Sequence, residues 1–120
     1  MILILPLPNS TNVHWRHGRG ITYLSKQGQE FRRRVLGIVQ TVLPNHKPLT
    51  GRLEMHVEIY PKDRRKTDLD NRLKGLGDAL QHAGVFVDDE QIDKLIVERK
   101  EVVKGGQCIV HIKELAPSVL

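Results

Sequence analysis

The first half of the chain contains a short apolar segment and, after it, a segment whose apolar residues follow the period of a helix. Residues 2–7 are mostly apolar and are followed by Pro8, which predicts a short strand. A polar, basic loop is expected over residues 9–20, and a helix from a cap at Ser25 to about Leu43. The apolar residues of this helix recur at i, i+4, i+7 and i+11, and they are Phe31, Val35, Ile38 and Val42.

The second half alternates first with period two and then with the period of a helix. Apolar residues at every other position over 53–59 predict a half-buried strand, which a proline ends. A helix is predicted over 68–82, where the apolar positions recur about one turn apart. These positions are Leu69, Leu73, Leu76, Leu80 and Ala83. Residues 92–103 and 107–114 predict two strands that pair as a hairpin around the turn Lys104-Gly105-Gly106.

This order of elements predicts an α/β fold. We expect one compact domain over residues 1–120, with a mixed β-sheet and two main helices packed on it, and a frayed tail at residues 116–120. The single Cys108 lies in an alternating apolar pattern, which indicates a buried core thiol and a reducing compartment. Because no apolar segment has the length of a signal or membrane span, we expect a cytoplasmic protein without a membrane partner.

Charge adds a specific chemical feature to this outline. The chain carries 19 Lys and Arg against 14 Asp and Glu, and the run from Arg64 to Asn71 places Asp68 and Asp70 among the cations. Such cations bind a phosphate backbone, and the carboxylates are ligands for a divalent metal beside it. A second acidic group, Asp88-Asp89-Glu90, follows the predicted helix and can return a third carboxylate to the first two.

The predicted site therefore consists of metal ligands Asp68, Asp70 and Asp89, with Lys74 as a further catalytic residue. Two carboxylates about 4 Å apart repel by roughly 4 kcal/mol at an effective dielectric constant near 20, so such a cluster needs a cation. Mg²⁺, for which Mn²⁺ can substitute, suits oxygen ligands and supports phosphodiester hydrolysis. Lys74, one turn beyond Asp70, is placed to bind phosphate oxygens.

Alternatives to this site are structural. Thr67 and Asp70 have the spacing of a capping box, and Asp68 is another candidate N-cap, so both acids can serve only to begin a helix. Lys74 can form an i, i+4 ion pair with Asp70. On this interpretation the chain is a basic nucleic-acid-binding module without catalysis.

Other polar residues favour less specific roles. The pair His14 and His17 lacks partners at the spacing of a zinc site, and DNA contact or ordinary exposure is expected for both. Trp15 is expected to pack against its own domain rather than stack on a base. The triplet Arg32-Arg33-Arg34 cannot share one face of a helix, and a solvated surface is its ordinary role.

Several motifs, taken in order, resemble the RusA family of Holliday-junction resolvases over about residues 5–114. They are Pro6-Leu7-Pro8-Asn9-Ser10 with Arg16, Gly18 and Arg19, the run from Arg64 to Asn71 with Lys74, Asp78-Ala79-Leu80 with Ala83-Gly84, Val87-Asp88-Asp89-Glu90-Gln91, and the turn at Lys104. Each motif is weak alone, but the ordered set is specific.

The resemblance implies a homodimeric, Mg²⁺-dependent crossover junction endodeoxyribonuclease of DNA recombination and repair, which nicks two opposed strands of a four-way junction. The family's metal-binding acids fall on Asp68, Asp70 and Asp89, with Asp88 ranked below Asp89, and its catalytic lysine falls on Lys74. The expected DNA-binding residues are Arg16, Arg19, Arg64, Arg65, Lys66 and Asn71. One departure is Thr67, where the resemblance implies an arginine.

Overall fold

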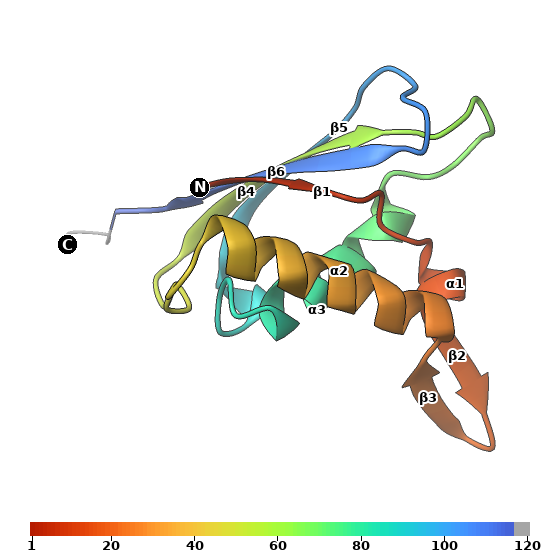
Figure 1. The fold of residues 1–120 in the computed structure, drawn as a ribbon, viewed down its shortest axis with the longest axis horizontal. Coiled ribbons are helices and arrows are strands. Elements are labelled where there is room, and N and C mark those ends of the chain that lie inside the picture. Colours follow the sequence, from red (N-terminus) through yellow and green to blue (C-terminus); the bar gives the residue numbers. More distant parts are fainter. Residues whose placement is uncertain (117–120) are drawn as a thin grey trace.

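A computed structural model describes residues 1–116 of the chain (Figure 1). The elements in chain order are β1 (Ile2–Leu5), α1 (Thr11–His14), β2 (Trp15–Gly18), β3 (Ile21–Leu24), α2 (Lys26–Val42), β4 (Leu53–Tyr60), η1 (Asp70–Arg72), α3 (Leu73–His82), η2 (Asp89–Gln91), β5 (Ile92–Arg99) and β6 (Gln107–Glu114). The elements η1 and η2 are single 3-10 turns. Apart from residue 116, the predicted frayed tail lies outside the described residues.

Four strands form one mixed sheet in the order β1-β6-β4-β5, in which β5 runs parallel to β4 and the other neighbours are antiparallel. Both α2 and α3 lie on one face of this sheet (Figure 1). The predicted α/β fold with a mixed sheet and two main helices is therefore confirmed. Among residues 1–116, no helix has the length and hydropathy needed to cross a membrane.

The core lies between the sheet and these two helices. Side chains of β4 alternate strictly between buried and half-buried positions, so that Leu53, Met55, Val57 and Ile59 face the helices. The stripe predicted for α3 is also confirmed, because Leu76 and Leu80 are fully buried and its other members pack against the core. Apolar burial of this kind contributes roughly 25 cal/mol per Å² and stabilises the fold.

The predicted hairpin between the last two strands is wrong. β4 lies between β5 and β6, and the connection over residues 100–106 crosses from one side of β4 to the other. The glycines still form a turn, since Gly105 and Gly106 have φ values of 80° and 72°. Gly106 also approaches Leu7 so closely that a Cβ atom there would lie 2.7 Å from the leucine Cδ2.

The predicted stripe on α2 needs one correction. Ser25 caps this helix as expected, with its Oγ accepting from the Gly28 N–H at 2.9 Å. However, Val42 is 54% exposed and Val39 is buried in its place. Residues three or four apart lie on the same face of a helix with 3.6 residues per turn. Val39 lies four residues after Val35 and so continues the buried face.

The segment predicted as a loop over residues 9–20 is more ordered than expected. It contains the short helix α1 and then β2, which pairs antiparallel with β3 to form a hairpin that projects from the body beside α2 (Figure 1). Arg19 and Gly20 at its tip have φ values of 51° and 75°. Positive φ at both central residues is typical of a type I′ turn, whose twist suits a two-residue hairpin connection.

Candidate active site

The segment that carries Asp68 and Asp70 joins β4 to α3. The helix begins at Leu73 after the single turn of η1, and not at Asp68 as predicted. No side chain caps either helix start, so the interpretation of these acids as helix caps is wrong. Both acids are exposed, and within residues 1–116 neither side chain forms a hydrogen bond or an ion pair.

Three hydrogen bonds hold the backbone on either side of this acid pair. Arg99 Nη2 donates to the Thr67 carbonyl at 2.7 Å, and Thr11 Oγ1 donates to the Asn71 carbonyl at 2.9 Å. Arg72 Nη1 donates to the Pro8 carbonyl. The acids are therefore fixed to β5 on one side and to the N-terminal segment on the other, while their carboxylates stay free for a ligand.

Lys74 lies in the first turn of α3 and is exposed. The ion pair with Asp70 that its spacing permits is absent from the part of the chain that the structure describes. Its ammonium group is free to meet an anion on the same face of the helix as Asp70.

A capping box holds the second acidic group. Asp88 Oδ1 accepts from the Glu90 N–H at 2.9 Å, and Gln91 Oε1 accepts from the N–H groups of Val87 and Asp88. The Gln91 amide is itself anchored, because its Nε2 donates to the Leu49 and Gly51 carbonyls. Asp88 thus caps the 3-10 turn η2 that carries Asp89.

Asp89 packs over α3 at Gly77. Its Oδ2 lies 3.6 Å from the position that a Cβ atom on Gly77 would occupy, and its N–H donates to Gln81 Oε1 at 3.2 Å. Gly77 follows Asp70 by seven residues, which is about 10 Å along a helix. Asp70 in η1, Lys74 in the first turn of α3 and Asp89 beside Gly77 therefore form a row that runs from η1 along α3.

The electrostatics around Asp89 favour a cation. Burial, together with the neighbouring carboxylates of Asp88 and Asp78, raises the pKa of Asp89 above its ordinary value. Negative groups gathered at this end of the row disfavour a further negative charge, and a bound cation would relieve the repulsion.

The acids fit Mg²⁺ by chemistry and in part by spacing. Among residues 1–116, no three His, Cys, Asp or Glu side chains lie close enough to form a complete protein site for a metal. Mg²⁺ does not require one, since it commonly keeps several waters and binds one or two carboxylates together with substrate phosphates. Asp68 and Asp70 provide such a pair, two residues apart and free of other partners.

Comparison with known proteins places this chain in a family. The family model described as endodeoxyribonuclease RusA matches residues 6–113. The chain belongs to the RusA family. The crossover junction endodeoxyribonuclease RusA of Escherichia coli (strain K12) is 36% identical over 113 residues, which cover 94% of this chain and 93% of that protein. The protein of the same name from Enterobacteria phage HK97 is 41% identical over 112 residues, which cover 93% of this chain and 92% of the relative.

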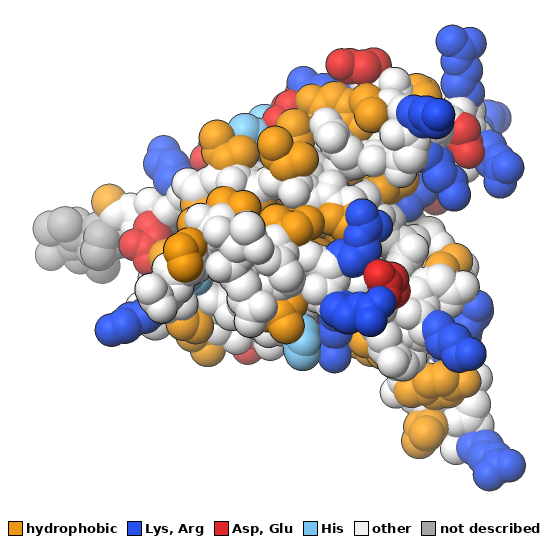
Figure 2. Space-filling model, viewed as in Figure 1, with side chains coloured by type: hydrophobic (Ala, Val, Ile, Leu, Met, Phe, Trp, Pro, Cys, Tyr) orange, Lys and Arg blue, Asp and Glu red, His pale blue; other side chains and the backbone are white. Residues whose placement is uncertain are grey.

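This RusA-family chain carries its expected DNA-binding residues on two projecting segments. Arg64, Arg65 and Lys66 are exposed in the connection after β4, whereas Arg16 and Arg19 lie on the β2–β3 hairpin. Figure 2 shows Lys and Arg side chains along the side of the molecule from which both segments project. Asn71 is half-buried in η1, between the acid pair and α3.

The sequence analysis missed a polar network beneath this surface. Arg32 Nε and Nη2 each donate to Asp78 at 2.8 Å, and His14 Nε2 lies 3.4 Å from Asp78 Oδ2. His14 is completely buried, so the predicted DNA contact or exposure of this residue is wrong. Arg32 is likewise not the free surface cation expected of its triplet. The network joins α1, α2 and α3.

Proposed function

We propose that this protein is a Mg²⁺-dependent crossover junction endodeoxyribonuclease, which resolves four-way DNA junctions by symmetric hydrolysis of two phosphodiester bonds. The observation that carries the proposal is the similarity to proteins of that name over 92–93% of their length. The exposed, unpartnered Asp68 and Asp70 within a basic segment support it chemically.

Each candidate residue then has a role. Asp68 and Asp70 would hold a Mg²⁺ directly, and Asp89, which lies farther along α3, is proposed as the third ligand through a coordinated water. The ion would supply a polarised phosphate oxygen and a more acidic water. Lys74 binds the non-bridging oxygens of the phosphate and offsets charge that develops there. The cations of the two projecting segments hold the DNA arms, with Asn71 beside the acids.

Cleavage of a labelled four-way junction tests the proposal. With Mg²⁺ we expect paired nicks at symmetric positions on opposed strands, and no cutting of a linear duplex of the same sequence. EDTA should abolish the reaction, and Mn²⁺ should restore it. Tight junction binding without cleavage under either metal would instead indicate a binding module without catalysis.

We also expect a homodimer. Two coordinated cuts in a four-way junction require two active sites related by the two-fold symmetry of the substrate, and a C2 dimer supplies them. Light scattering at micromolar concentration should therefore give twice the 13.7 kDa mass of one chain. A mass of one chain under these conditions would contradict the dimer without affecting the assignment of the acids.

A further inference from the structure

A hollow of about 290 Å³ lies beside the acid pair, between the N-terminal segment and the connection after β4. Asn9 and Ser10 line one side, and Lys62, Arg65 and Thr67 line the other. Arg72, two residues beyond Asp70, extends into it from η1. Three cations and only one acid, Asp63, line this hollow, so its chemistry favours an anion.

Arg72 is a half-buried cation that lacks a close carboxylate partner. The one hydrogen bond of its side chain within residues 1–116 runs from Nη1 to the Pro8 carbonyl, and no carboxylate lies within ion-pairing distance. A partly desolvated guanidinium with unused donors is unfavourable unless an anion binds it.

The single acid in the hollow is already engaged. Asp63 Oδ1 accepts from the backbone N–H of Arg65 at 3.0 Å, and its Oδ2 lies 3.6 Å from Arg65 Nε. The donors that remain are the Arg72 fork, the Lys62 ammonium and the hydroxyl groups of Ser10 and Thr67. A phosphate group suits this set, because a guanidinium fork binds two of its oxygens at once.

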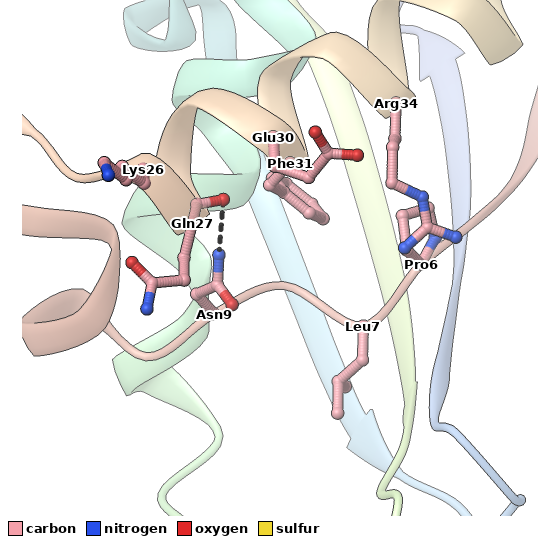
Figure 3. A pocket seen from close by; sticks show the side chains of 8 residues that line it. All are labelled: Pro6, Leu7, Asn9, Lys26, Gln27, Glu30, Phe31 and Arg34. Carbon is pink, nitrogen blue, oxygen red and sulfur yellow. Dashed lines mark hydrogen bonds between the residues drawn. The ribbon is translucent and has the colours of Figure 1, made fainter.

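Both walls of the hollow are fixed. Asn9 Nδ2 donates to the Gln27 carbonyl at 3.1 Å and so ties the N-terminal segment to α2, beside a second hollow of about 330 Å³ (Figure 3). That second hollow contains Glu30 between its cations and is the poorer anion site. Thr67 is tied to β5 through Arg99. Fixed walls reduce the ordering cost when a ligand binds.

We propose that this hollow binds a backbone phosphate of the DNA, next to the phosphate that is cut, with Arg72 as its main ligand. The inference rests on the proposed function, because only a strand that passes the acid pair would place a phosphate here. Arg72 is a positioning residue on this account: it holds the strand in register with Asp68 and Asp70 but does not contact the bond that breaks.

Single methylphosphonates, which remove the charge of one phosphate, test this inference. We would scan them across the strand around the cut and measure junction binding in EDTA by fluorescence anisotropy. For the wild type, one position beside the cut should weaken binding roughly tenfold. Arg72→Gln should weaken binding to the unmodified junction by a similar factor, with no further loss at that position. For Arg72→Gln, the slope of the logarithm of the binding constant against the logarithm of the salt concentration should be shallower by about one unit.

Lys113→Gln is the matched control, since it removes one exposed positive charge near the far end of β4 from this hollow. It should retain the wild-type methylphosphonate profile. If Arg72→Gln binds every methylphosphonate junction more weakly than the wild type by the same factor, the phosphate site is wrong. Arg72 then serves only to hold Pro8. If circular dichroism shows Arg72→Gln unfolded, Arg72→Lys takes its place and should keep part of the coupling. A wild type that binds no junction would overturn the proposed function itself.

Discussion

Replacement of Asp70 by alanine should reduce junction cleavage by roughly a thousandfold or more while junction binding remains. This loss corresponds to about 4 kcal/mol of transition-state stabilisation, which a metal ligand can supply. The fold should be unaffected, because the Asp70 side chain is exposed and forms no hydrogen bond or ion pair within residues 1–116. Binding should be equal or tighter, since the change removes a negative charge from a basic surface.

The measurement is single-turnover cleavage and anisotropy on the same junction, with thermal unfolding of each variant. Glu101→Ala is the control, because it removes an exposed carboxylate outside the row on α3. It should cleave at the wild-type rate. A variant at Asp70 that cleaves normally would exclude this residue from the metal site, and one that loses binding and stability together would indicate a structural role.

The elements with the strongest periodicity were predictable from the sequence. The strict alternation over 53–59 and the repeated leucines of α3 each leave one arrangement that buries all the apolar side chains. The N-terminal hairpin was not predicted, because its strands have four residues each and none of these residues is fully buried. Such strands give no alternation of buried and exposed positions from which to recognise them.

The pairing of the last strands shows where a local signal fails. Glycines between two strand patterns favour a hairpin, and this preference led to the wrong pairing. A competing signal was present, since β4, α3 and β5 form a strand-helix-strand unit, which commonly gives parallel neighbours. β5 therefore occupies one side of β4 and leaves the other to β6.

The sequence indicates the candidate residues of the site but not the distances between them. Asp68, Asp70 and Lys74 are close in sequence, so their positions follow from the start of one helix. The position of Asp89 depends on the capping box at Asp88 and Gln91 and on the space over Gly77, which no sequence period indicates. These contacts place Asp89 in a row with Asp70 instead of in a cluster with it.

Long-range polar contacts were the least predictable. Arg32 and Asp78 are 46 residues apart, and His14 and Asp78 are 64 apart. The sequence places Asp78 four residues beyond Lys74 on the same helix. It does not indicate that the Asp78 side chain turns toward α1 and α2. Only the folded structure brings Asp78 to its partners His14 and Arg32.

Asp78→Ala should lower the free energy of unfolding by about 2 kcal/mol. The change removes the polar partner of the buried His14 ring and the acceptor of the Arg32 guanidinium. A larger loss is not expected, since the side chains of Arg32 and Asp78 are 30% and 22% exposed and water compensates in part. For a chain of 120 residues this change lowers the melting temperature by about 8 °C. Glu30→Ala, which removes the partner of Arg33 in an exposed pair, should change it by less than about 2 °C.

The effect of Asp78→Ala should also depend on pH. Burial favours the neutral carboxyl, but the hydrogen bonds and charges of Arg32 and His14 outweigh it and lower the pKa of Asp78. A carboxyl whose pKa is lower in the folded state stabilises the protein above its ordinary pKa, and this contribution is lost as the pH falls through the folded value. The difference in stability between wild type and Asp78→Ala should therefore be constant above about pH 5 and shrink below about pH 4. Urea unfolding of both proteins across this range measures it, and a difference that persists unchanged in acid would mean that the charge of Asp78 contributes nothing.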